Sequence, residues 1–329
     1  MIACMSTSEH PLHWKKIFAR SYAGMAELSA LQQPYYEATT LQQIEQLFPV
    51  RLSKELLSDF KFDHPVLKQY LPDARELINP DGYGEDPVGD REATSAGGLL
   101  KKYQHRALLI TTNTCPVHCR YCFRKDYPYS RETPNQHRYE TALAAVKKDH
   151  SLNEIILSGG DPLSLDDDLL SYLFTSLAAI EHIQTVRVHT KFPSIYPQRV
   201  TDALLSILAT TRLNTVVVLH INHPDEITAS VKYAAEQIKH TNTTTLNQAV
   251  LLRDVNDATD TLAELSHRLF SAGILPYYLH LLDKARGTHH FHVERARAEI
   301  IMQQLKQRLP GYLVPKLAQE LSGHASKDY

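Results

Sequence analysis

Short apolar runs alternate with longer amphipathic stretches from about residue 105 onward. Six runs have the length and β-branched content of buried strands: 107–111, 154–158, 185–189, 215–220, 244–248 and 276–280. The stretches between and after them have helical periodicity, at 138–149, 165–179, 198–208, 226–240, 258–272 and 293–308. Asp225 and Asp257 are the expected N-caps of two of these helices. This alternation predicts a parallel sheet with right-handed crossovers, and six units rather than eight predict an open, partial (βα)6 barrel of the α/β class.

The first 95 residues follow a different pattern. Short helical patterns at 41–48 and 54–62 precede a stretch at 79–89 that is rich in Gly, Pro, Asn and Asp, which is loop chemistry. We therefore expect an N-terminal helical cap and connector over 1–95, a core barrel over 96–310 and a short C-terminal tail over 311–329.

Polar, glycine or cysteine residues follow the predicted strands. The carboxyl ends of the strands form the active-site face of (βα) barrels, so these positions predict a single site. Each residue taken alone is equally compatible with a helix cap or a turn. The positions are the cysteine loop after the first strand, then Gly159, Gly160 and Asp161, then Thr190 and Lys191, Asn222, Gln248 and Asp283.

Composition and net charge exclude several classes of protein. The chain has 329 residues, 43% of them hydrophobic and 22% charged, which is ordinary for a soluble globular protein. A net charge of −2 excludes a general nucleic-acid binder. No apolar run approaches the roughly 20 residues of a membrane span, and no secretory signal pattern is present. We expect a cytoplasmic location, where Cys4 would remain reduced.

Three of the four cysteines lie close together, in Cys115-Pro-Val-His-Cys119-Arg-Tyr-Cys122. Iron–sulfur clusters are normally held by four cysteines, so three thiolates would hold three irons of a 4Fe–4S cube and leave the fourth open for a small molecule. Zinc is the competing metal, with His118 as a fourth ligand by type, but structural zinc usually takes two separated ligand pairs. Three apolar buried cysteines are the remaining interpretation.

Two basic residues outside the cysteine motif are candidates for ligand binding. Arg124 lies two residues beyond Cys122, and a guanidinium binds a carboxylate through two hydrogen bonds. Lys327 lies in a Gly-x-x-Ser-Lys context near the C-terminus, and such a lysine can form a Schiff base with pyridoxal 5'-phosphate. A solvated charge is the alternative for each.

The cysteine loop, with Tyr121 before its third cysteine, resembles the signature of the radical S-adenosylmethionine (radical SAM) enzymes, in which S-adenosyl-L-methionine chelates the open iron. From about residue 90 onward the chain resembles one family within them, the lysine 2,3-aminomutases. Ser158-Gly-Gly-Asp-Pro-Leu163, Pro197-Gln-Arg199, His220-Ile-Asn222-His-Pro224 and Asn247-Gln-Ala-Val-Leu-Leu-Arg253 carry this resemblance. It implies an isomerase that uses an adenosyl radical and pyridoxal 5'-phosphate to move the amino group of L-lysine from C2 to C3.

The resemblance also implies roles for individual residues. Cys115, Cys119 and Cys122 would ligate the 4Fe–4S cluster, and Gly159, Gly160, Asp161, Asn222 and Gln248 would bind cofactor. Lys327 would be the catalytic lysine that carries pyridoxal 5'-phosphate, with Arg199 at the phosphate of that cofactor. Arg124 would bind the carboxylate of the substrate, and Asp283 with Glu320 would bind its ε-ammonium.

The chain departs from the clostridial members of this family. It lacks their further C-terminal cysteines, which bind a structural zinc, and its tail stops two residues after Lys327. In this it resembles the bacterial branch that makes β-lysine for modification of elongation factor P. The expected partners are L-lysine, an electron donor such as flavodoxin or ferredoxin, and a functional link to elongation factor P and its lysyl ligase, with the oligomeric state open.

Two alternative functions remain at this point. The first is a related aminomutase for another amino acid such as glutamate, although two carboxylates, Asp283 and Glu320, would repel an acidic side chain. The second is a non-catalytic iron–sulfur or zinc-binding protein, which would need neither S-adenosyl-L-methionine nor pyridoxal 5'-phosphate.

Overall fold

A nine-stranded sheet forms the centre of the fold. The computed structural model describes residues 13–20, 22–30, 37–129, 136–321, 323 and 327–329, so Cys4 lies outside the described residues. The strand order is β11-β10-β9-β8-β7-β6-β5-β4-β3. Its six central strands are those that the sequence predicts: β5 (Arg106–Thr112), β6 (Glu154–Gly159), β7 (Thr185–Thr190), β8 (Asn214–Leu219), β9 (Thr244–Val250) and β10 (Leu275–His280).

The central strands pair in parallel, each with the next along the chain. Because the strand order is linear and not cyclic, the sheet is open, and the predicted α/β fold with a partial barrel is confirmed. Three short strands extend its edges: β11 (Lys316–Ala318) runs parallel to β10, while β4 (Leu99–Leu100) and β3 (Thr94–Ser95) add antiparallel strands beside β5. A separate pair joins β1 (Tyr22–Ala23) to β2 (Leu52–Ser53).

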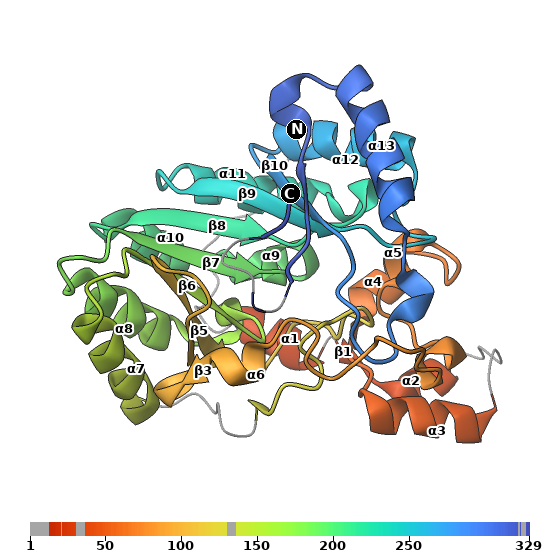
Figure 1. The fold of residues 1–329 in the computed structure, drawn as a ribbon, viewed down its shortest axis with the longest axis horizontal. Helices are drawn as coiled ribbons and strands as arrows, with labels where there is room; N and C mark the ends of the chain where they lie inside the picture. Colours follow the sequence, from red (N-terminus) through yellow and green to blue (C-terminus); the bar gives the residue numbers. More distant parts are fainter. Residues whose placement is uncertain (1–12, 21, 31–36, 130–135, 322, 324–326) are drawn as a thin grey trace.

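Helices connect consecutive strands and surround the sheet. Figure 1 shows α7 and α8 at the lower left of the sheet and α11 and α12 above it. The connecting helices are α7 (Gln136–Lys148), α8 (Asp167–Ala178), α9 (Phe192–Ile195), α10 (Asp202–Thr210), α11 (Ala229–Lys239), α12 (Thr259–Ser271) and α13 (Arg295–Arg308). Short 3-10 turns accompany them: η4 (Pro162–Ser164), η5 (Pro197–Arg199), η6 (Pro224–Glu226), η7 (His289–Phe291) and η8 (Gly311–Leu313). No helix in the described part of the chain is long and apolar enough to cross a membrane.

Three local predictions about these helices are wrong. The expected helix at 198–208 is split, because Thr201 caps α10 by accepting a hydrogen bond from the Leu204 amide at 3.2 Å. Asp225 lies inside η6, and Thr228 caps α11 instead. Asp257 accepts a hydrogen bond from the Asp254 amide and closes the turn before α12, whose N-cap residue is Ala258.

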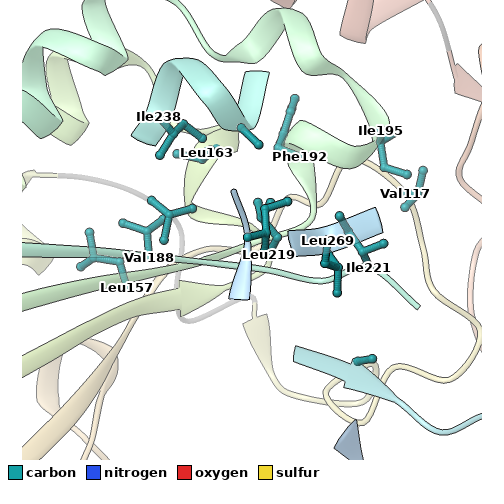
Figure 2. Packing of buried hydrophobic residues seen from close by; sticks show 14 of the residues in the cluster. Val117, Leu157, Leu163, Val188, Phe192, Ile195, Leu219, Ile221, Ile238 and Leu269 are labelled. Carbon is teal, nitrogen blue, oxygen red and sulfur yellow. The ribbon is translucent and has the colours of Figure 1, made fainter. Parts of the chain in front are cut away.

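The core lies between the sheet and its helices. Alternate residues of β7, such as Val186 and Val188, are buried. Val188 belongs to the same buried cluster as Leu219 of β8 and Ile238 of α11 (Figure 2). Full burial of one such side chain contributes about 1.5–3 kcal/mol. Val117, between the first two clustered cysteines, belongs to the same cluster, so the cysteine loop is anchored in the core.

The N-terminal region packs on this core. Its helices are α1 (His13–Arg20), α2 (Met25–Ala30), α3 (Ala38–Leu47), α4 (Lys54–Asp59), α5 (Pro65–Lys68), η1 (Ala74–Leu77), α6 (Asp90–Ala93) and η2 (Ala96–Gly98). Figure 1 shows α2 and α3 at the lower right, away from the sheet. The Trp14 ring meets Phe192 of α9 edge-on at 5.4 Å, and Leu52, Leu67 and Tyr70 join the main buried cluster.

Candidate active site

The cysteine loop begins three residues after β5 ends. Cys115, Cys119 and Cys122 are half-buried free thiols. Burial raises the pKa of the Cys122 thiol to about 11, with a further contribution from Cys119. Burial also raises the pKa values of Cys115 and Cys119, and that of Cys115 is raised further by Cys122. The three sulfurs therefore interact electrostatically, and each raised pKa disfavours the thiolate. A bound metal cluster would lower these pKa values, because coordinated thiols are deprotonated.

The candidate fourth zinc ligand of this loop is engaged by other residues. Within the described ranges, no three Cys, His, Asp or Glu side chains are grouped as ligands of one metal ion. A 4Fe–4S cube distributes three thiolates over three different irons. His118, the candidate fourth zinc ligand, donates from Nδ1 to the Pro49 carbonyl oxygen at 2.8 Å, and its ring stacks on Phe48 at 4.9 Å.

Gly159 and Gly160 lie against the start of the cysteine loop. Gly159 has a φ of +121°, which favours glycine, and a Cβ atom on Gly160 would lie 2.4 Å from the Thr114 carbonyl oxygen. The Gly160 amide donates to the Thr112 carbonyl oxygen at 2.7 Å. The two glycines therefore allow the backbone of β6 to approach the backbone that leads into Cys115. Contact with S-adenosyl-L-methionine remains a prediction for both.

Asp161 ties the ends of two strands together. Its carboxylate accepts hydrogen bonds from Thr190 Oγ1 at 2.7 Å, from the Lys191 and Phe192 amides at 2.7 and 3.1 Å, and from the Leu163 amide at 3.0 Å. Burial raises the pKa of Asp161 to about 6, and these hydrogen bonds oppose the shift. The carboxylate is thus ionised at neutral pH and fully engaged by the protein.

Asn222 lies behind the cysteine loop. Its Nδ2 donates to the Tyr121 hydroxyl and to Gln69 Oε1, both at 2.8 Å, and its Oδ1 accepts from the Val250 amide at 2.8 Å. The Asn222 side chain is buried, and its contacts with Gln69 and Val250 hold it where it binds the hydroxyl of Tyr121, the aromatic residue next to Cys122.

Gln248 belongs to a row of polar side chains across the sheet. Its Nε2 lies 3.0 Å from His220 Nε2 and 3.4 Å from His189 Nδ1. Burial lowers the pKa values of His220 and His280 to about 3, and it lowers that of His189 as well. The three imidazoles are therefore neutral. His189 and His280 were not selected from the sequence, although each is the last or next-to-last residue of its strand, which is the signal that could have found them.

The structure brings Glu320 and Lys327 together beside Asp283. Lys327 Nζ donates to Glu320 Oε2 at 2.9 Å, and Lys102 Nζ donates to Glu320 Oε1 at 2.9 Å. Burial raises the pKa of Glu320, but Lys327 and Lys102 outweigh it and lower the pKa to about 2. Burial, then Glu320, raises the pKa of Asp283 to about 7, and Lys327 opposes this shift. Sequence reasoning missed Lys102.

A backbone bridge in the tail explains why Glu320 and Lys327 meet. Gln319 and Asp328 exchange two hydrogen bonds of 2.9 Å, N to O in both directions. Glu320 and Lys327 are the next residues inside this bridge. Arg295 of α13 holds both bridge residues through Nη1, at 3.2 Å from Gln319 Oε1 and 2.8 Å from Asp328 Oδ2.

Arg124 joins the same group of charges. Its Nε donates to Asp90 Oδ2 at 2.5 Å, and its Nη1 donates to Ser158 Oγ at 3.2 Å. Asp90 also pairs with Lys102, the partner of Glu320. Arg124, Asp90, Lys102, Glu320 and Lys327 thus form one continuous chain of alternating charges, which connects the residue after the cysteine loop to the tail.

Arg199 is not part of this charge chain. Its side chain is 0% exposed, donates to the Leu163 carbonyl oxygen at 2.6 Å, pairs with Asp167 at 2.8 Å and lies 4.5 Å from the Trp14 ring. The structure therefore does not bring Arg199 together with Lys327. The cations beside Glu320 are Lys102 and Lys327, and the role of Arg199 at the phosphate stays a prediction.

A cavity of about 330 Å³ lies on the N-terminal side of the site. Its lining includes Leu28, Phe62, Arg253, His290 and Phe291, and none of the predicted site residues. Phe291 separates it from the cysteine loop, since the same ring meets Tyr121 edge-on at 6.2 Å.

Comparison with known proteins agrees with this geometry. The sequence matches the radical SAM superfamily over residues 109–265, which includes the cysteine loop, so this part of the chain is a radical SAM domain. It is 42% identical to an L-lysine 2,3-aminomutase of Buchnera aphidicola over 87% of this chain and 85% of that protein. The corresponding proteins of Escherichia coli and Haemophilus influenzae are 42% and 39% identical, over 86% and 91% of this chain and 83% and 90% of theirs. The chain belongs to the L-lysine 2,3-aminomutase family.

Membership of this family implies three cofactors: a 4Fe–4S cluster, S-adenosyl-L-methionine and pyridoxal 5'-phosphate. Among solved structures, a radical SAM methyltransferase from Sphaerobacter thermophilus has a TM-score of 0.49 and 16% identity, over 67% of this chain and 68% of that one. The residues present fit the implied groups: three free thiols in one loop, and a lysine held by a carboxylate at the edge of the sheet.

Proposed function

We propose that this chain converts L-α-lysine to β-lysine by moving the amino group from C2 to C3, with pyridoxal 5'-phosphate bound at Lys327. The observation that supports this best is the convergence of Asp283, Glu320 and Lys327 on one place. When bound, the cluster and S-adenosyl-L-methionine supply a carbon radical, and pyridoxal 5'-phosphate supplies the group that carries the migrating nitrogen.

The cofactors would be held by residues at strand ends. Cys115, Cys119 and Cys122 would ligate the cluster, and the backbone at Gly159 and Gly160 would contact S-adenosyl-L-methionine. Asp161, Asn222 and Gln248 are already engaged by the protein, so we propose that they support the cofactor site by orienting the strand ends and Tyr121. Arg199 stays a sequence prediction for the phosphate, and the position of Lys102 favours Lys102 in that role.

Glu320 supports recognition of an alkylammonium. Its carboxylate already binds two ammonium groups, those of Lys327 and Lys102. With pyridoxal 5'-phosphate held at Lys327, Glu320 would be the carboxylate placed to bind the ε-ammonium of the substrate, with Asp283 as the second carboxylate. The neutral imidazoles of His189, His220 and His280 would not repel this charge. Arg124, oriented by Asp90 and Ser158, would bind the substrate carboxylate.

Replacement of Asp283 by alanine should raise the KM for lysine roughly ten- to a hundredfold, because a hydrogen bond to a charged group contributes about 1.5–3 kcal/mol. Binding of S-adenosyl-L-methionine and the cluster spectrum should stay unchanged. The measurement is steady-state kinetics with L-lysine, L-glutamate and norleucine, resolving α- from β-amino acids. Unchanged lysine kinetics, or norleucine turnover equal to that of lysine, would refute the lysine assignment, and turnover of glutamate alone would favour the related aminomutase.

The pH dependence of lysine binding should follow Asp283. The pKa of Asp283 is raised to about 7, so the carboxylate is protonated below that pH and its attraction for an ammonium is lost as pH falls. The KM for lysine should therefore rise on the acid side of about pH 7, by up to roughly tenfold per pH unit. The Asp283→Asn variant should have a high KM with no such dependence, and a parental KM that is flat through this range would contradict the assignment.

We further propose that the β-lysine supplies modification of elongation factor P by its lysyl ligase, in the cytoplasm, with flavodoxin or ferredoxin as electron donor. Similarity over nearly full length to the bacterial relatives supports this proposal. The test is whether elongation factor P gains the mass of β-lysine when it is incubated with its ligase and the product of this enzyme.

A further inference from the structure

The N-terminal region contacts the backbone on both sides of Cys119. The His118 amide donates to the Arg51 carbonyl oxygen at 2.8 Å, and the Arg120 amide donates to the Gln69 carbonyl oxygen at 2.8 Å. Both acceptors lie more than forty residues before the loop, outside the barrel strands. The position of Cys119 is therefore set by the 48–76 segment as well as by β5.

A buried ion pair between Arg120 and Glu76 stabilises this contact. Arg120 is 0% exposed and Glu76 is 2% exposed. Arg120 Nε lies 3.0 and 3.1 Å from the two Glu76 carboxylate oxygens, and Nη2 lies 2.5 Å from Oε2. Arg120 Nη1 donates to the Phe48 carbonyl oxygen at 2.9 Å. The planar guanidinium has five N–H donors in a fixed geometry, so this set of acceptors fixes its orientation and that of residue 120.

Glu76 is itself held in place. Its Oε1 accepts a hydrogen bond from the Asp73 amide at 2.9 Å, and Asp73 caps η1 in return. The Glu76 carboxylate is thus hydrogen-bonded to the start of η1, which holds it in place independently of the cysteine loop. The Phe48 ring adds a contact from the other side, stacked on His118 at 4.9 Å and 4.8 Å from the Arg120 guanidinium.

A second set of buried contacts reaches Tyr121, which follows Arg120. Gln69 Nε2 donates to Glu226 Oε1 at 3.2 Å, and Gln69 Oε1 accepts from Asn222, which also donates to the Tyr121 hydroxyl. Lys191 Nζ pairs with Glu226 at 2.9 Å. Three positions around Cys119 are therefore held by polar contacts: 118 and 120 by the N-terminal region, and 121 by Asn222, whose side chain Gln69 binds.

We propose that the N-terminal segment 48–76 is a working part of the cluster site, and that Glu76 and Arg120 are positioning residues that hold Cys119 where a cluster can bind. This inference rests on the proposed function. It assigns to the N-terminal region a role that no sequence motif indicates. Residues that orient the ligands of a metal affect its binding through those ligands, without touching it.

The alternative is that the ion pair only attaches the N-terminal region to the barrel. The variant Glu76→Gln distinguishes the two, because it keeps the shape of the side chain and removes its charge. Glu264→Gln is the matched control: Glu264 pairs with Arg268 at 2.7 Å on the exposed face of α12, far along the chain from the loop. Both variants are made in the full chain and their folding is checked by circular dichroism.

Three measurements compare the two variants with the parent protein. Amide hydrogen exchange of the cluster-free protein reports the 118 and 120 amides directly. Iron and sulfide are counted after anaerobic reconstitution and a chelator challenge. Electron paramagnetic resonance of the reduced cluster is recorded before and after addition of S-adenosyl-L-methionine. In Glu76→Gln we expect faster exchange at 118 and 120 with β5 unchanged, roughly ten- to a hundredfold weaker cluster retention, and an altered response of the spectrum.

The outcomes for the two variants distinguish a positioning role of the ion pair from mere attachment. Parent-like exchange, retention and spectra in Glu76→Gln would overturn the proposal, whereas Glu264→Gln should behave as the parent throughout. If Glu76→Gln fails to fold, the Phe48→Leu variant provides the test. This substitution removes the aromatic ring that contacts His118 and Arg120 and leaves the ion pair intact. Cluster retention equal to that of the parent in Phe48→Leu would overturn the proposal. A parent chain that binds no 4Fe–4S cluster would instead refute the proposed function itself.

Discussion

Replacement of Cys119 by alanine should leave a folded protein that retains no 4Fe–4S cluster and forms no 5'-deoxyadenosine. Cys119 lies between the other two clustered cysteines, and no further cysteine of the described residues is available to replace it. With two thiolates, a cube would lack protein ligands on two irons instead of one. Iron and sulfide analysis with an assay for 5'-deoxyadenosine after reduction is the measurement.

Cys4→Ala provides the matched control for this variant. Cys4 is the fourth cysteine of the chain and lies well outside the motif, so its loss should leave iron content and 5'-deoxyadenosine formation at the level of the parent. Full iron content in Cys119→Ala, or equal losses in both variants, would contradict a cluster held by the three cysteines of the loop.

Replacement of Lys327 by alanine should remove covalently held pyridoxal 5'-phosphate and abolish β-lysine formation, because the amine that would hold the cofactor is gone. Lys327 is held by Glu320 beside Asp283, with 18% of its side chain exposed. Lys316 is the competing lysine, but it is exposed on β11 with its Nζ 5.7 Å from the Tyr329 ring. Borohydride reduction of the loaded parent followed by peptide mass mapping should place the cofactor on Lys327.

Lys316→Ala is the control for that experiment. It should load and react as the parent does, because it changes a lysine of the same tail that is not paired with Glu320. A borohydride label on Lys316, or full loading of Lys327→Ala, would overturn the assignment. Loss of cofactor with retention of the cluster in Lys327→Ala would further separate the two cofactor sites.

The central fold could be predicted because its six parallel strands contain short, largely apolar runs separated by stretches with helical periodicity. Runs such as 154–158 and 215–220 are almost continuously apolar, and such runs leave little choice of structure. The edge strands β3 and β4 have two residues each and carry no such pattern. The prediction of the α11 cap was wrong because Asp225 and Thr228 are both good capping residues, and Asp225 lies inside η6 while Thr228 accepts from the Val231 amide.

The site residues could be predicted where a cysteine, glycine or polar residue follows the end of a predicted strand. Cys115, Gly160 and Asn222 each follow a strand, and the parallel topology brings such positions to one edge of the sheet. The supporting contacts could not be found in this way, because they join segments that are far apart in sequence. Glu76 pairs with Arg120, and Lys102 pairs with Glu320 more than two hundred residues later. The pairing of Arg199 with Asp167 likewise could not be derived from the motif, and the role of Arg199 at the phosphate stays a prediction.

The central claim is that a radical made at the cysteine loop moves the amino group of a lysine held by Asp283 and Glu320. The most direct measurement uses reconstituted protein with S-adenosyl-L-methionine, pyridoxal 5'-phosphate, a reductant and L-lysine deuterated at C3, followed by mass spectrometry of the amino acids and of the nucleoside. The account predicts β-lysine together with deuterium in S-adenosyl-L-methionine or 5'-deoxyadenosine. Unlabelled 5'-deoxyadenosine with L-α-lysine recovered unchanged would contradict it.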